Sequence, residues 1–231
     1  MPANKLLLFD IDGTLILSGG MGQKAMLAAL SEIFETPFEA SITDFAGSTD
    51  RLIIHNLIER YRVAQPPFEE QIDAVVKRYR DHLAHLLSDN HHIEVMPGIY
   101  PLLAAVGKRE DLHPALLTGN IASGAQIKLS PVDLWRPFPV GGFGDDAMDR
   151  NLLPPVAVQR AEAFYGVVYR PGDVWVIGDT PRDIECGRVN GYRTLAVATG
   201  HYNAATLAAE KPDVLLEDLS DTEAVLACFE G

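Results

Sequence analysis

An apolar run that ends in two carboxylates constrains this chain more than any other feature of its sequence. Residues 5–9 read Lys-Leu-Leu-Leu-Phe, Asp10 and Asp12 follow closely, and Gly13 allows a sharp turn. Residues two apart in a strand point to the same face, so Asp10 and Asp12 can enter one site. Burying unpaired carboxylates costs free energy unless a cation neutralises them. The segment therefore indicates a divalent metal site at the end of a buried strand.

Similar apolar runs recur in the second half of the chain and alternate with helical patterns. These runs are rich in Leu, Val and Ile without polar alternation, as expected for a parallel sheet covered on both faces. Strands are predicted at residues 5–9, 114–117, 174–177, 194–197 and 214–216, and helices at 99–108, 155–165, 184–190 and 204–210. The alternation predicts an α/β fold with a Rossmann-like doubly wound parallel sheet.

Residues 17–92 break this alternation, because they contain no convincing strand and follow a helical period instead. Three amphipathic helices are predicted there, at residues 23–34, 52–61 and 68–87. An all-helical block placed after the first strand is most simply an inserted cap. We therefore expect a helical cap at residues 17–92 and a discontinuous α/β core made of residues 1–16 and 93–231. The glycines near the two ends of the block are either hinges or ordinary loop residues.

The overall charge limits the partners of the chain. Its 231 residues carry a formal net charge of −13, so nucleic acid and anionic membranes are poor partners. No apolar run approaches the roughly 20 residues needed to cross a bilayer, and the amino terminus leads directly into strand-like sequence without a signal peptide. The two cysteines do not form a disulfide framework. We expect a cytoplasmic protein, either a monomer or a weak homodimer.

Further polar residues follow the other predicted strands. Thr118 ends one strand, Asp179 ends another, and Asp183 lies four residues later, where a helical turn brings both carboxylates to the same side. Ligands of open α/β sheets bind beyond the carboxyl ends of the strands. A single Asp or Thr at such a point is usually only a turn or cap residue. The ordered combination indicates one shared site.

Together these motifs resemble those of the haloacid dehalogenase superfamily of aspartate-based phosphotransferases, in particular its phosphoglycolate-phosphatase-like branch with a helical cap. The segment Asp10-Ile11-Asp12-Gly13-Thr14 matches the first motif of that family, DxDGT. Thr118 matches the second motif, and Gly178-Asp179 with Asp183 matches the fourth, GDxxxD. The resemblance extends over nearly the whole chain.

The resemblance also implies roles for the carboxylates. Asp10 would attack phosphorus and become an aspartyl phosphate, and Asp12 would act first as a general acid and then as a general base. Mg²⁺ would be held by the Asp10 carboxylate, the Asp12 backbone carbonyl and Asp179. Asp183 would either be a further metal ligand or orient metal-bound water.

Phosphate binding is assigned by the same resemblance, with one departure from the family pattern. Thr118 would bind a phosphate oxygen together with the backbone amides of Gly119 and Asn120. The third motif of the family usually supplies a Lys, but the matching stretch around Arg150 contains none. Arg150 is the candidate cation, although its shape and reach differ from those of Lys. Lys128, in the helix expected after Thr118, is the alternative.

The leading hypothesis is an Mg²⁺-dependent phosphatase that acts on a small phosphorylated metabolite. A phosphomutase of the β-phosphoglucomutase type is the alternative. Such an enzyme must hold a phosphorylated intermediate while the substrate reorients and must exclude water, and nothing in the predicted cap indicates these properties. A non-catalytic sensor of phosphorylated ligands is less expected, because such a protein could lose Asp10 or Asp12 without penalty. Residues 47–51 resemble a loop that related enzymes place in the active site, and they also fit an ordinary helix N-cap.

Overall fold

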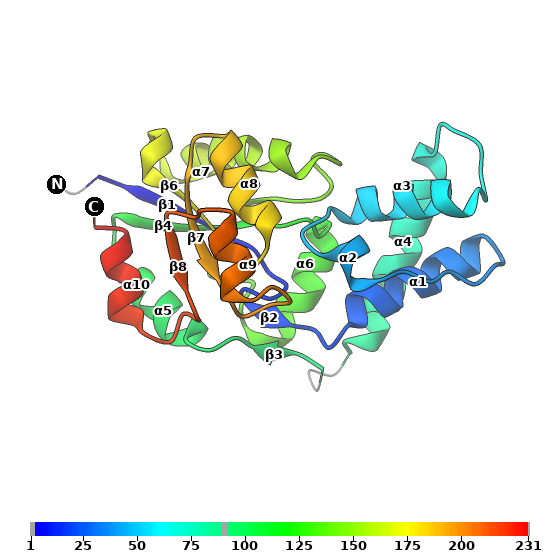
Figure 1. Cartoon of the computed structure of the whole chain (residues 1–231), viewed down its shortest axis with the longest axis horizontal. Helices are drawn as coiled ribbons and strands as arrows, with labels where there is room; N and C mark the ends of the chain where they lie inside the picture. Colours follow the sequence, from blue (N-terminus) through cyan, green and yellow to red (C-terminus); the bar gives the residue numbers. More distant parts are fainter. Residues whose placement is uncertain (1–2, 89–91, 231) are drawn as a thin grey trace.

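The computed structural model describes residues 3–88 and 92–230, and a six-stranded parallel sheet forms its centre (Figure 1). The order of the strands is β5-β4-β1-β6-β7-β8, and every neighbouring pair is parallel. The strands are β1 (Lys5–Phe9), β4 (Leu112–Leu117), β5 (Gly141–Gly142), β6 (Val174–Gly178), β7 (Arg193–Val197) and β8 (Val214–Leu216). This architecture confirms the predicted doubly wound α/β fold.

Helices cover both faces of the sheet, which explains why β1 is apolar at successive positions. Leu6 and Leu8 pack on one face with residues of α7 (Leu153–Tyr165) and α8 (Pro181–Val189). Leu7 and Phe9 pack on the other face with residues of three further helices, α5 (Ile99–Val106), α6 (Ala122–Leu129) and α10 (Thr222–Cys228). A short helix, α9 (Ala204–Ala209), lies between β7 and β8 in sequence.

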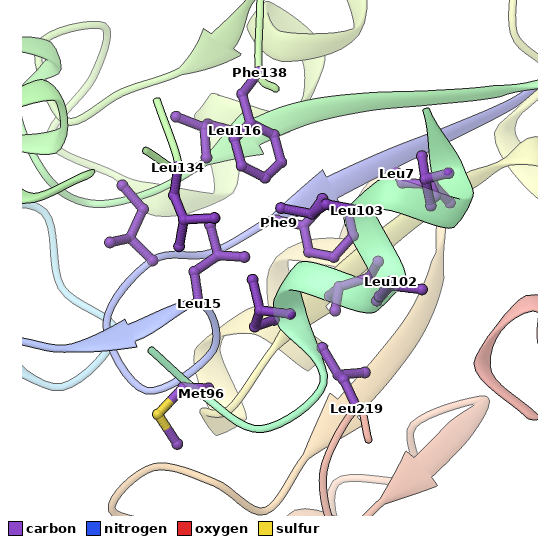
Figure 2. Packing of buried hydrophobic residues seen from close by; sticks show 14 of the residues in the cluster. Leu7, Phe9, Leu15, Met96, Leu102, Leu103, Leu116, Leu134, Phe138 and Leu219 are labelled. Carbon is purple, nitrogen blue, oxygen red and sulfur yellow. The ribbon is translucent and has the colours of Figure 1, made fainter. Parts of the chain in front are cut away.

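Figure 2 shows the second of these two clusters. Phe9 contacts Phe138 edge to face, with ring centroids 5.6 Å apart, and Leu102 and Leu103 of α5 lie over the same strand. Edge-to-face aromatic pairs add specificity to the area that they bury. Asp10 therefore directly follows a fully buried strand.

The first four helices of the described chain lie together to one side of the sheet (Figure 1). They are α1 (Met21–Ile33), α2 (Ile42–Phe45), α3 (Asp50–Tyr61) and α4 (Glu69–Leu86). This α1–α4 group packs around a hydrophobic cluster in which Leu30, Ile54, Leu57, Ile72 and Leu83 are fully buried, and which the sheet region joins through Ile121. No helix among the described residues is long and apolar enough to cross a membrane.

Two short strands join the α1–α4 group to the sheet region. β2 (Ile16–Leu17) leads into the group, and β3 (Glu94–Val95) leads out of it. They pair antiparallel, with Ile16 opposite Val95, and the Met96 amide donates to the Leu15 carbonyl at 3.0 Å. The two connections therefore run side by side, so the α1–α4 group is held at two adjacent points.

Four predicted helices, at 23–34, 52–61, 155–165 and 184–190, begin two or three residues earlier than predicted, and two of them have a polar N-cap. The predicted helix 52–61 is α3, which begins at Asp50. Its N-cap is Thr49, whose hydroxyl accepts a hydrogen bond from the Leu52 amide. The predicted helix 184–190 is α8, which begins at Pro181 after a capping box between Thr180 and Asp183. Three 3₁₀ turns, η1 (Ser130–Val132), η2 (Arg150–Leu152) and η3 (Pro171–Asp173), complete the fold.

Candidate active site

The carboxyl ends of three adjacent strands meet at one edge of the sheet and supply its polar side chains. Asp10 follows β1, Thr118 follows β4 and Asp179 follows β6. The Asp10 amide donates to the carbonyl of Ile177 at 2.9 Å, so the chain stays paired with β6 to the end of the strand. Gly13, with φ of 86°, then turns the chain away.

Three buried carboxylates form a cluster at this edge. Asp10, Asp179 and Asp183 each offer an oxygen, and these oxygens all lie within 4.8 Å of one another. Burial raises the pKa of Asp10 to about 6, although Arg150 works in the opposite direction. Burial, and then the charges of Asp183 and Asp10, raise the pKa of Asp179 well above its usual value. The charges of the three carboxylates are therefore only partly neutralised by Arg150, and their oxygen ligands suit a hard divalent cation such as Mg²⁺.

Two glycines leave room around the Asp179 carboxylate. A Cβ atom at Gly13 would lie 2.3 Å from Asp179 Oδ2, and one at Gly200 would lie 1.7 Å from the same oxygen. Thr14 donates its hydroxyl to the other oxygen, Oδ1, at 3.1 Å. The chain thus fixes one Asp179 oxygen and keeps side chains away from the other, as a metal ligand requires.

Arg150 links two carboxylates of this cluster. It is the first residue of η2, its side chain is 5% exposed, and its Nη2 lies 3.2 Å from Asp10 Oδ1 and also pairs with Asp183 Oδ1. The other oxygen of Asp183 accepts from the Thr180 amide at 3.0 Å and from its hydroxyl at 2.7 Å. Both oxygens of Asp183 therefore already have protein partners. This arrangement favours a role for Asp183 in orienting its neighbours.

Asp12 lies apart from the cluster and has a different partner. Lys128 Nζ of α6 lies 2.8 Å from Asp12 Oδ1, 2.6 Å from Asp12 Oδ2 and 2.7 Å from Asn120 Oδ1. The Asn120 amide nitrogen donates to Asp12 Oδ2 and to Thr118 Oγ1, both at 2.8 Å. Burial alone would raise the pKa of Asp12, but Lys128 and Asn120 outweigh it and the pKa is lowered. Asp12 is therefore ionised in the free protein.

The start of α3 contacts the strand ends directly. The Asp50 amide donates to the Gly119 carbonyl at 2.8 Å, and Asp50 Oδ2 accepts from the Ile121 amide at 2.9 Å. Nearby, the Thr49 hydroxyl donates to the Met148 carbonyl at 2.7 Å. The α1–α4 group therefore closes over the polar edge of the sheet.

A cavity of about 310 Å³ lies between the α1–α4 group and the strand ends. Seven of the residues proposed from the sequence line it, and the eighth, Asp183, lies in the carboxylate cluster behind it. The seven are Asp10, Asp12, Thr118, Gly119, Asn120, Arg150 and Asp179. The structure thus brings all eight into one site, with Lys128 beside Asp12.

Sequence reasoning missed several residues of this site. Thr14 belongs to the DxDGT segment and Thr180 precedes Asp183 at capping-box spacing, so both had a sequence signal that was not used. Asp50 was noted only as part of a loop or N-cap. Gly200 had no signal, because its closeness to Asp179 depends on the loop after β7.

A parallel sheet whose strand ends carry a buried carboxylate cluster beside a cavity defines an α/β enzyme with its active site at that edge. The chain belongs to the family of haloacid dehalogenase-like hydrolases, whose model matches residues 7–197.

Known relatives cover most of the chain at low identity. It is 24% identical over 221 residues to phosphoglycolate phosphatase 1 of Pseudomonas aeruginosa, covering 94% of this chain and 78% of that protein. It is 25% identical over 222 residues to pyrophosphatase PpaX of Bacillus cereus, covering 95% of each. A solved structure of a hydrolase from Pseudomonas syringae is similar with a TM-score of 0.73 at 21% identity, covering 99% of this chain and 100% of that one. This last likeness supports the fold.

Proposed function

We propose that this chain is an Mg²⁺-dependent phosphatase that hydrolyses a small phosphorylated metabolite through an aspartyl-phosphate intermediate. The observation that supports the proposal is the cluster of Asp10, Asp179 and Asp183, of which Asp10 and Asp179 line the cavity together with Arg150. The names of the two curated relatives, a phosphoglycolate phosphatase and a pyrophosphatase, agree with phosphoryl chemistry.

The proposed first half-reaction transfers the phosphoryl group to the protein. An Asp10 oxygen forms a bond to phosphorus, and the bond from phosphorus to the leaving oxygen breaks. Arg150 stabilises the charge on the phosphoryl oxygens, while Thr118 and the amides of Gly119 and Asn120 orient them. Bound Mg²⁺, held by Asp10, Asp179 and the Asp12 carbonyl, would supply positive charge that screens the nucleophile from the anionic substrate.

Asp12 carries the proton in both half-reactions. It gives a proton to the leaving oxygen in the first, and in the second it takes one from the water that attacks phosphorus, which frees Asp10 and releases phosphate. Lys128 and Asn120 hold the Asp12 carboxylate in a fixed orientation. Since Lys128 favours the ionised form, we propose that substrate binding shifts this pairing so that Asp12 can become protonated.

We also propose that residues 17–92 act as a cap over a core formed by residues 1–16 and 93–231. The hydrophobic cluster of α1–α4 and the paired strands β2 and β3 support this division. The contacts of Asp50 with Gly119 and Ile121 are those of a closed cap.

The test is release of inorganic phosphate by the purified, metal-replete protein from a panel of phosphorylated metabolites. Asp10→Asn should abolish turnover and leave the fold intact, because the amide keeps the shape of the carboxylate but is not an anionic nucleophile. Activity within about tenfold of wild type, a difference of only about 1.4 kcal/mol in barrier, would refute the assignment. Chelation should remove activity, Mg²⁺ should restore it, and Ca²⁺ should substitute poorly because its larger coordination shell misplaces the reacting groups.

The same panel of phosphorylated metabolites distinguishes a phosphatase from the two alternative functions. A phosphomutase would isomerise a sugar phosphate without releasing phosphate, and a sensor would bind ligands without turnover. Asp10, Asp12 and the carboxylate cluster are all in place, and this favours the phosphatase over the sensor.

A further inference from the structure

The cavity above the carboxylate cluster has two chemically different halves. Its floor is the polar site at the strand ends. Its wall on the side of the α1–α4 group is mainly apolar and includes Leu17, Met26, Ile42, Phe45 and Ile53, with Ser18, Gln23, Ser48 and Tyr79 as polar members. Leu17 and Ile42 are 38% and 47% exposed, although both are large apolar side chains. A ligand whose phosphate occupies the floor therefore places the rest of its atoms against an apolar wall.

The cationic side chains at this cavity already pair with acidic or amide oxygens of the protein. Among the described residues, Lys128 and Arg150 are the lysine and arginine that line it. An ammonium group has three donors, and Lys128 has two Asp12 oxygens and the Asn120 oxygen as partners. Arg150 pairs with Asp10 and Asp183 at the phosphate end. His201 also borders the cavity, but it is exposed in the loop that follows β7.

The acidic groups at the cavity offer a second anion no positive charge, although burial raises the pKa of one of them, Asp50, to about 7. Four carboxylates line it, those of Asp10, Asp12, Asp50 and Asp179. Asp50 stands on the α1–α4 side, where the Ile121 amide fixes one of its oxygens. A second anion on the substrate would approach Asp50 and the apolar wall, and it would lose hydration there without gaining a free cation.

We propose that the preferred substrates are phosphomonoesters of an uncharged, largely apolar alcohol, and that the site selects against a second carboxylate or phosphate. The inference rests on the proposed phosphatase function and narrows it. It also separates this chain from the named activities of its two curated relatives, since phosphoglycolate and pyrophosphate both carry a second anionic group.

A matched pair of substrates tests the inference. Benzyl phosphate and 4-carboxybenzyl phosphate differ only in one carboxylate far from the phosphate. With Mg²⁺ in excess, we expect kcat/KM to be at least about tenfold lower for the carboxylated ester. An equal or higher value for that ester, or for 2-phosphoglycolate or inorganic pyrophosphate relative to benzyl phosphate, would overturn the inference. Phosphate release from none of the four would instead overturn the proposed phosphatase function itself.

A pair of lysine variants tests where the discrimination arises. Ile42→Lys adds a cation at the apolar wall, so the ratio of kcat/KM for benzyl phosphate to that for the carboxylated ester should fall by about threefold or more. Ile33→Lys is the matched control, because Ile33 is an exposed isoleucine, at 39%, that does not line the cavity. The inference fails if the ratio is unchanged in Ile42→Lys or falls equally in Ile33→Lys.

Asp50→Asn removes the ionisable carboxyl group while keeping an oxygen for the Ile121 amide. The same ratio of kcat/KM should fall in this variant, and thermal unfolding should show that it remains folded. A folded variant with an unchanged or larger ratio would show that Asp50 does not repel the second anion.

Discussion

A single methyl group at Gly119 should separate the α1–α4 group from the strand ends. A Cβ atom there would lie 2.0 Å from the backbone oxygen of Ser48, whereas real Cβ contacts are essentially never shorter than 3.0 Å. The two backbones must therefore move apart by about 1 Å, which breaks the 2.8 Å bond between Asp50 and Gly119 and the 2.9 Å bond between Asp50 and Ile121. A neutral hydrogen bond and one to a carboxylate together contribute about 2–4 kcal/mol.

If closure of the α1–α4 group is needed for turnover, Gly119→Ala should lower kcat/KM for benzyl phosphate by about 30-fold to 1,000-fold. The backbone angle of Gly119 lies outside the left-handed region, so the effect is not one of chain strain. Gly172→Ala is the matched control, because its Cβ meets no atom within 4 Å. Steady-state phosphate release, with circular dichroism to verify folding, measures both variants. Gly119→Ala with kcat/KM within about threefold of wild type would refute the reasoning, since that is less than 1 kcal/mol.

Three further substitutions test other parts of the structure. Arg150→Ala should lower kcat/KM by an amount that corresponds to a loss of about 2–4 kcal/mol in transition-state stabilisation, and Arg150→Lys should recover part of that loss. Equal rates for Arg150→Ala and wild type would exclude Arg150 as the cation that stabilises the transition state. Gly200→Ala should displace the Asp179 carboxylate and weaken Mg²⁺ activation, so that a higher Mg²⁺ concentration restores activity; an unchanged activation curve would contradict this. Leu57→Ala should destabilise the protein by about 2–5 kcal/mol in chemical unfolding, since Leu57 is fully buried in the α1–α4 core; a loss below about 1 kcal/mol would show that this core repacks.

The sheet was predictable where burial leaves a mark on the sequence. β1 is apolar at consecutive positions because Leu6 and Leu7 face different helical layers, and both side chains are buried there. β5 left no such mark, because it consists of Gly141 and Gly142 and exists only by pairing with β4. β2 and β3 are two residues each, too short for any period to appear. The helices α2 and α10, of four and seven residues, were also not predicted.

The site was predictable as far as strand ends determine it. Asp10 and Asp179 follow neighbouring parallel strands, so their convergence follows from topology. The pairing of Lys128 with Asp12 does not, because it depends on which face of α6 turns toward the first loop. The sequence therefore indicated which residue types gather at this edge, but the pairing of each cation with its carboxylate depends on helix packing.

The position of β1 in the sheet has a consequence for how the chain folds. β1 is residues 5–9, yet its two neighbours are residues 112–117 and 174–178. The contacts of α1–α4 are mostly closer in sequence, so this group can fold early, whereas β1 cannot be paired on both sides until β6 has been synthesised. Until then Leu6, Leu7, Leu8 and Phe9 form a hydrophobic strand with at least one unpaired edge, the type of segment that aggregates or binds chaperones. The strand that positions the proposed nucleophile is thus the first sheet segment to be made, yet it is completed only after residues 174–178 have been made.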